Sequence, residues 1–115
     1  MSAPAFAPFG VGGGVVVSAG IAALDPATLT PLFDDFDAQA RWVLARLDMV
    51  LGEAGAARED LLRVECFLAD RQWFGAWNAH YAEHFGTTPP ARTTVVCGLP
   101  VDGLLIEVQV IASIT

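Results

Sequence analysis

The chain has 115 residues, of which 54% are hydrophobic and 17% charged, and its formal net charge is −7. Its 6 Lys and Arg residues form no basic run, which argues against nucleic acid and anionic membranes as partners, since both are bound largely through cations. One hydrophobic core suits this length, so we expect a single domain over residues 1–115. So much apolar material is hard to bury in a small monomer, which favours an oligomer.

The N-terminal part of the chain predicts a turn followed by a strand. Residues 1–13 are rich in Pro, Ala and Gly, and Gly12-Gly13-Gly14 marks a turn. Val15 to Ala23 is short and β-branched, which predicts a buried strand, and residues 25–32 are expected to form a loop. A phosphate-binding loop would need a helix after the glycines. Because a strand follows them here, a hairpin turn is the better interpretation.

The clearest helical pattern covers residues 35–54, where apolar side chains recur at spacings of three and four. Asp34 or Asp35 can cap its start and Gly55 can end it. The short connector Arg58-Glu59-Asp60 is polar.

The second half of the chain predicts three strands and another helix. Leu62 to Leu68, Thr93 to Gly98 and Leu104 to Ile114 are the strands, and the helix has Asp70 as its N-cap and Gly86 as its end. This order of elements predicts an α+β fold with an antiparallel or mixed sheet and both helices packed on one face.

Features of secretion and membrane insertion are missing from the sequence. The N-terminus lacks the charged and apolar regions of a signal peptide, and no apolar stretch approaches the ~20 residues that span a bilayer. Cys66 and Cys97 lie inside apolar runs, which is typical of reduced, buried thiols. We therefore expect a cytoplasmic protein.

Two further patterns have a structural and a functional interpretation. His80-Tyr81-Ala82-Glu83-His84 matches a zinc-hydrolase motif, but such a site needs a third protein ligand and none follows on a later helix. A polar helix face is the better interpretation, and no metal is expected. Trp42, Trp73 and Trp77 could line a ligand pocket, although aromatic residues at helical spacing more often lie in a core or an interface.

Arg92 and Glu107 are charged residues within apolar strands, where a charge is costly unless it is paired, ligand-bound or exposed. Arg92 opens the run Thr93-Thr94-Val95-Val96, and Glu107 is the one acidic residue between Leu104 and Thr115. From the residues alone, Arg92 could cap a strand end and Glu107 could point to solvent. A ligand site is the alternative.

The surroundings of these two residues resemble a family signature. In chain order the motifs are Pro90-Ala91-Arg92-Thr93-Thr94-Val95, Leu99-Pro100 and Ile106-Glu107-Val108-Gln109-Val110-Ile111-Ala112. Supporting segments upstream are Val16-Val17-Ser18, Leu24-Asp25-Pro26, Asp37-Ala38-Gln39-Ala40 and Trp77-Asn78-Ala79-His80-Tyr81. By these motifs the chain resembles the RidA/YjgF family of reactive-intermediate deaminases.

The resemblance implies a chorismate-mutase-like α+β fold and a homotrimer with an inner β-barrel and clefts between subunits. It also implies hydrolysis of 2-aminoacrylate-type enamines and their imine tautomers to 2-keto acids and ammonia, without metal or cofactor. Arg92 would hold the substrate carboxylate, since a guanidinium grips a carboxylate through two hydrogen bonds. Glu107 would position or activate water, which an imine carbon needs in order to lose ammonia.

The sequence departs from the family pattern around the expected pocket. The common P-Y-S-x-A segment is here Pro8-Phe9-Gly10, the S-G-[QH] segment is Ser18-Ala19-Gly20, and a position that is often cysteine is Thr94. We expect Phe9, Ser18 and Thr94 to shape the pocket, and backbone amides near Ser18 and Val95 to orient the substrate.

Asn78 and Tyr81 are expected to be structural. Two alternatives to the deaminase remain open at this point. One is a specialised hydrolase or tailoring enzyme of the same family with a different substrate. The other is a non-catalytic trimer that binds small carboxylates or a protein partner.

Overall fold

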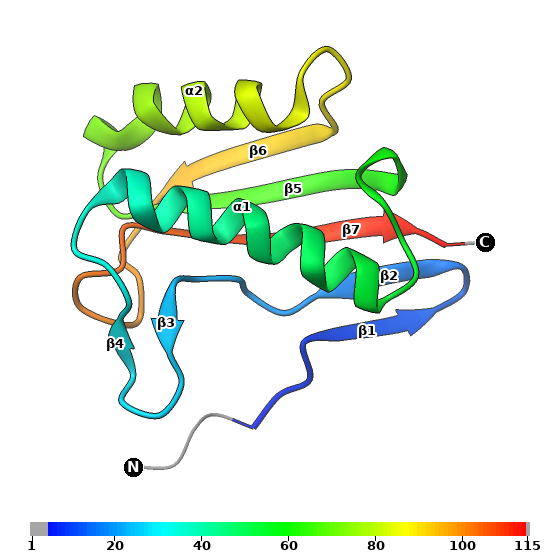
Figure 1. The fold of residues 1–115 in the computed structure, drawn as a ribbon, viewed down its shortest axis with the longest axis horizontal. Helices are drawn as coiled ribbons and strands as arrows, with labels where there is room; N and C mark the ends of the chain where they lie inside the picture. Colours follow the sequence, from blue (N-terminus) through cyan, green and yellow to red (C-terminus); the bar gives the residue numbers. More distant parts are fainter. Residues whose placement is uncertain (1–4, 115) are drawn as a thin grey trace.

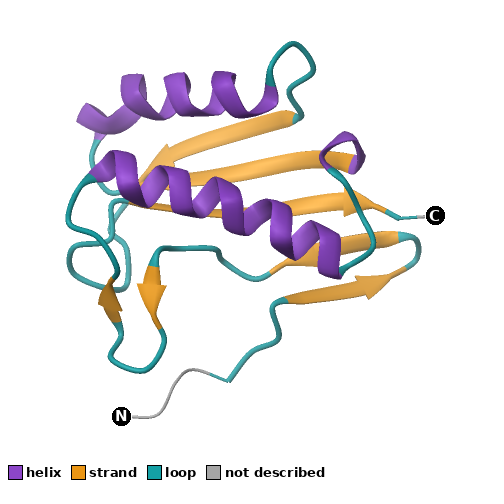
Figure 2. Cartoon of the chain, in the orientation of Figure 1, coloured by secondary structure: helices purple, strands orange, loops and turns teal. Residues whose placement is uncertain are grey.

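A computed structural model describes residues 5–114 and shows one mixed sheet with helices over one side (Figures 1 and 2). The strands of this sheet are β1 (Phe9–Gly12), β2 (Val15–Ser18), β5 (Leu61–Leu68), β6 (Ala91–Val96) and β7 (Ile106–Ser113). Their order across the sheet is β1-β2-β7-β5-β6, with β5 and β6 parallel and the other neighbours antiparallel. The predicted α+β class and mixed sheet are confirmed.

Two helices cover the same face of the sheet, as predicted (Figure 2). Helix α1 (Phe36–Glu53) begins after Asp35, whose side chain accepts a hydrogen bond from the backbone N–H of Ala38 at 3.0 Å. Helix α2 (Phe74–Phe85) ends at Gly86, whose φ of 61° favours glycine. Within residues 5–114, neither helix has the length and apolarity to cross a membrane.

The hairpin before α1 differs from the sequence-based prediction. The sequence assigned no strand bounds within residues 1–13, yet β1 pairs with β2 through a turn in which Gly13 and Gly14 have positive φ. The interpretation of the glycines as a hairpin turn is thus confirmed. Strand β1 was missed because two of its four residues are glycine, so it carries almost no strand propensity of its own.

The strand predicted from Val15 to Ala23 is interrupted after Ser18. The Ser18 Oγ accepts a hydrogen bond from the backbone N–H of Val110 at 2.9 Å. This side chain takes the place of the backbone carbonyl that would continue the ladder. Pairing with β7 resumes at Ile21, which exchanges two backbone hydrogen bonds with Val108. Residues 19 and 20 therefore bulge out of the sheet beside β7.

Other boundaries shift by a few residues. The expected loop over 25–32 contains a small ladder of β3 (Leu24–Asp25) and β4 (Thr30–Pro31). Asp70 caps a 3₁₀ turn over Arg71–Trp73, and α2 itself begins only at Phe74. Strand β7 begins at Ile106, two residues after the predicted start.

The core lies between the sheet and the two helices. Along β7 the residues Ile106, Val108, Val110 and Ala112 are buried, whereas Glu107, Gln109, Ile111 and Ser113 are only half-buried. This alternation places the second set on the face of the sheet that the helices leave open (Figure 1). Trp77 belongs to the core, while Trp42 and Trp73 pack at its margin.

Both cysteines are free thiols, but only Cys66 is fully buried, and Cys97 is half-buried. Burial raises the pKa of the Cys66 thiol, which keeps it protonated and unreactive.

Candidate functional site

Arg92 lies on the edge strand β6 with its side chain against α2. One Nη donates a hydrogen bond to Oδ1 of Asn78 at 2.7 Å. The guanidinium carbon lies 4.7 Å from the ring centroid of Tyr81 and 5.9 Å from that of Phe74. In the part of the chain that the structure describes, Arg92 forms no ion pair. Its charge is thus held by neutral groups, and its remaining N–H donors are available to an anion.

Behind Arg92, buried polar atoms gather around Cys66. Trp77 Nε1, Tyr81 OH and Thr94 Oγ1 are buried without a hydrogen-bond partner among residues 5–114. The Cys66 sulfur lies near Trp77 and Thr94, but sulfur is a weak partner. Burial, followed by the nearby Cys66, raises the pKa of Tyr81 to about 12. Tyr81 therefore stays neutral and presents its ring, rather than a phenolate, to the guanidinium.

Glu107 lies on the open face of the sheet, in a row with Phe67 and Val95 of the neighbouring strands. Its carboxyl carbon lies 3.1 Å from the point where a Cβ on Gly20 would stand. Glycine in the bulge is what leaves room for this side chain. Burial raises the pKa of the Glu107 carboxyl. A half-buried carboxyl with a raised pKa is suited to exchanging protons near neutral pH.

Within one chain, Arg92 and Glu107 cannot contact the same small molecule. Arg92 is in register with Val64, which is buried under the helices, whereas Glu107 is in register with Phe67 on the open face. Strand β5 separates β6 from β7. The two predicted catalytic residues thus lie on opposite faces of the sheet, and a site that uses both needs a second copy of the chain.

The other predicted site residues also divide between the two faces. Thr94 turns toward the helices, and its buried hydroxyl lies beside Cys66. Val95 is 41% exposed on the open face, in the row of Glu107. The Ser18 hydroxyl is used by the bulge, and Phe9 pairs opposite Ser18 while packing against the margin of the core.

Sequence reasoning underestimated the residues that hold Arg92. Asn78 and Tyr81 were expected to be structural, yet both contact the guanidinium, together with Phe74. The signal that would have found them is their spacing, because positions 74, 78 and 81 share one helix face. The role of Gly20 had no such signal, since it depends on the bulge.

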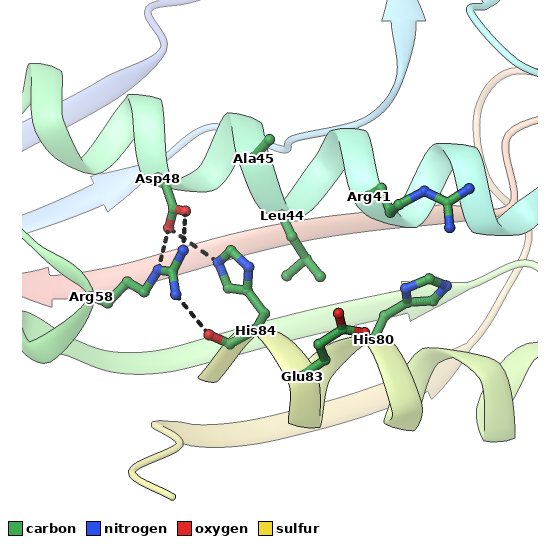
Figure 3. A pocket seen from close by; sticks show the side chains of 8 residues that line it. All are labelled: Arg41, Leu44, Ala45, Asp48, Arg58, His80, Glu83 and His84. Carbon is green, nitrogen blue, oxygen red and sulfur yellow. Dashed lines mark hydrogen bonds and ion pairs between the residues drawn. The ribbon is translucent and has the colours of Figure 1, made fainter. Parts of the chain in front are cut away.

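A second polar cluster lies between α1 and α2, around a hollow of about 480 Å³ (Figure 3). The Asp48 carboxylate accepts hydrogen bonds from Arg58 at 2.7 Å and contacts His84 Nε2 at 3.2 Å. His80 contacts Asp37 at 2.7 Å. The two histidines of the H-x-x-E-H pattern thus face different carboxylates of α1, and this geometry fits a polar bridge between helices.

Among residues 5–114, no three His, Cys, Asp or Glu side chains are grouped so that they could hold a metal ion.

Comparison with known proteins gives consistent similarities over nearly the whole chain. The family model described as Endoribonuclease L-PSP matches residues 2–114. A RutC family protein of Synechocystis is 40% identical over 102 residues, which cover 86% of this chain and 78% of that protein. A RutC family protein of Pyrococcus abyssi is 37% identical over 101 residues, with 87% and 79% covered.

Solved structures share the fold over nearly the whole chain, at lower sequence identity. RidA from the Antarctic bacterium Psychrobacter superposes with a TM-score of 0.84 at 26% identity, covering 98% of this chain and 94% of the other. A Mycobacterium tuberculosis member of the YjgF/YER057c/UK114 family has a TM-score of 0.82 at 28% identity, with 95% and 86% covered.

Proposed function

Because the chain belongs to the RidA/YjgF family, we propose that it hydrolyses reactive enamine and imine acids to 2-keto acids and ammonia, without a metal or cofactor. The observation that carries the proposal is the state of Arg92. Its guanidinium is fixed by Asn78 and Tyr81 and has no acidic partner among the described residues. Such a cation is prepared to receive the carboxylate of a 2-imino acid.

Glu107 is the proton-transferring group in this proposal. With the imine protonated, the Glu107 carboxylate removes a proton from a water molecule as the water oxygen bonds to the imine carbon and the C=N electron pair moves to nitrogen. Glu107 then returns that proton to the nitrogen of the resulting carbinolamine. The C–N bond breaks as the hydroxyl proton passes to the carboxylate, which leaves a 2-keto acid and ammonia, and the ammonia takes up that last proton as ammonium. The raised pKa of Glu107 supports this role, since one group must both accept and return a proton.

Arg92 and Glu107 lie on opposite faces of the sheet, which supports a homotrimer with clefts between subunits. In each cleft, one subunit would supply Arg92 and its neighbour would supply Glu107. The open sheet face offers an apolar surface for the inner barrel of such a trimer. Val17 and Val95 are 47% and 41% exposed on this face, and Phe67 and Ile111 lie half-buried beside them. An uncovered sheet face of this kind is costly in a monomer.

Some relatives carry the name endoribonuclease, but the charges of this chain disfavour RNA as its substrate. The net charge is −7 with 6 Lys and Arg residues. Of these, Arg58 is paired with Asp48 and Arg92 is held against α2. Binding to an RNA backbone takes several unpaired cations on one surface.

The test is turnover of 2-aminoacrylate and 2-iminobutyrate, generated in situ by a dehydratase, with ammonia release as the readout. We expect acceleration by the wild type and its loss in Arg92→Ala. Arg41→Ala, which removes an exposed arginine of α1, is the matched control and should keep full activity. If the folded, oligomeric wild type does not accelerate either reaction, the proposed activity is wrong. The protein would then act on a different substrate or serve a binding role.

A further inference from the structure

A cavity of about 690 Å³ adjoins Glu107, larger than the hollow between the helices. Apart from Arg46 and Glu107 its lining is apolar, and its larger side chains are Phe6, Leu24, Leu29, Trp42, Pro100 and Leu104. This volume and this lining are typical of pockets for small organic ligands. In the single chain, a methyl side chain would fill only a small part of this volume.

The wall next to Glu107 is built from the smallest side chains of the chain. Ala19 and Gly20 form the bulge, and Ala22 follows it, and all three line the cavity. The Glu107 carboxyl reaches this wall through the space that Gly20 leaves. A group bound in the cavity therefore lies beside the Glu107 carboxyl, which in the proposed reaction takes a proton from the attacking water.

Leu29 lines the cavity in an unusual backbone conformation, at the end of the turn between β3 and β4. Its φ is 57°, in the left-handed region where glycine or asparagine is normally found, and its side chain lines the cavity. A leucine held in this conformation is strained, and strain of this kind collects at ligand sites. Phe6, 68% exposed at the cavity rim, has apolar surface that a ligand would cover.

We infer that this cavity receives the side chain of the substrate, and that the enzyme acts on imine acids with bulky apolar side chains, aromatic or branched. The inference rests on the proposed function for the reaction but on the cavity for the substrate class. Each methylene buried in such a pocket improves binding by about fourfold. A benzyl side chain should therefore be preferred over a methyl group by at least tenfold.

The test compares two imines made in situ by an L-amino-acid oxidase, one from phenylalanine and one from alanine. We expect kcat/KM to be at least tenfold higher for the phenylalanine-derived imine. Ala22→Leu fills the cavity, so it should lower the ratio of the two kcat/KM values, phenylalanine-derived over alanine-derived, about tenfold. Ala27→Leu is the matched control, since Ala27 is exposed in the turn between β3 and β4 and lies outside the lining. Equal effects on both imines, or none, would overturn the inference.

Leu29→Gly provides a second variant that should fold well, because glycine relieves the positive φ while some apolar contact is lost. Its melting temperature should stay near the wild-type value while the preference for the bulky imine falls. An unchanged preference would argue against the pocket.

Direct binding separates this inference from the proposed function. Calorimetry with phenylpyruvate and pyruvate needs no turnover. Tighter binding of phenylpyruvate, lost in Ala22→Leu, would support the cavity even if no imine were hydrolysed. Equal binding of both keto acids would overturn the inference even if the deaminase activity were real.

Discussion

The two faces of the sheet hold their functional charges in different ways. On the helix-covered face, Arg92 is fixed by Asn78 and by the rings of Tyr81 and Phe74. On the open face, the Glu107 carboxyl forms no hydrogen bond with another described residue and rests against Gly20 beside a large apolar cavity. In the proposed function, the fixed guanidinium would hold the substrate carboxylate. The carboxyl on the open face would transfer a proton, beside space for a variable group.

The strongest way to break this comparison is to mix two inactive variants. Arg92→Ala and Glu107→Gln should each have very low deaminase activity. If each site takes Arg92 from one subunit and Glu107 from its neighbour, co-refolded mixtures should recover about a quarter of wild-type activity, the random probability of an intact pair. Ammonia release by the mixture measures this.

Mixing without unfolding is the control, because preformed oligomers should recover little. No recovery in co-refolded oligomers of wild-type size would place both residues in one subunit's site, against the geometry of the sheet.

The role of Glu107 can be sharpened by its pH dependence. Glu107→Gln should lower kcat by about 10²- to 10⁴-fold, the usual contribution of a general acid–base group. Because burial raises the pKa of Glu107, wild-type activity should fall as pH decreases through that raised value, at higher pH than for an ordinary glutamate. The ratio of wild type to variant, measured across pH, isolates this group from the ionisation of the substrate.

A ratio that does not change with pH would show that Glu107 does not transfer the proton. A second readout follows from the same pKa. Because the carboxyl has a higher pKa in the folded state, the wild-type protein loses stability as pH rises toward and through that pKa. Glu107→Gln lacks this ionisation, so it should be more stable than wild type at neutral pH. The difference in the free energy of unfolding should become smaller in acid. Thermal melts at several pH values measure it.

A smaller effect on activity is expected when Asn78, which positions Arg92, is replaced. Asn78→Ala removes one hydrogen bond to the guanidinium, and bonds to charged groups contribute about 1.5–3 kcal/mol. The substrate carboxylate is then held less well, so KM should rise about tenfold or more while kcat changes little. Gln72→Ala, before α2, is the matched control. A fall in kcat at constant KM would mean that Asn78 acts on the reacting atoms instead.

The elements that could be predicted from sequence are those with strong local signals. Helix α1 has its cap at Asp35 and its stop at Gly55, and every second residue of β7 from Ile106 to Ala112 is apolar. Strands β1, β3 and β4 had no such signal, because a glycine-rich edge strand and two-residue ladders exist only through their partners.

The candidate site could be predicted only in part, for a similar reason. A charge within an apolar strand marks both Arg92 and Glu107, and the buried neighbours Ile106 and Val108 already imply that Glu107 faces away from the core. The face of Arg92 could not be derived, because both sides of the edge strand β6 are partly exposed. That the two residues point to opposite faces follows from strand register, which no local pattern encodes.

The smallest effect concerns the buried hydroxyl behind Arg92. Thr94 Oγ1 has no hydrogen-bond partner in the described part of the chain, and an unsatisfied buried polar group costs about 1–3 kcal/mol. Thr94→Val keeps the shape of the side chain and removes the hydroxyl, so the free energy of unfolding should rise by about 1 kcal/mol. Chemical denaturation measures it, with Thr93→Val on the exposed side of the same strand as control. If Thr94→Val is instead less stable than wild type, the hydroxyl forms a stabilising hydrogen bond with the Cys66 sulfur. If the variant also has a higher KM, Thr94 lies within reach of the substrate held by Arg92.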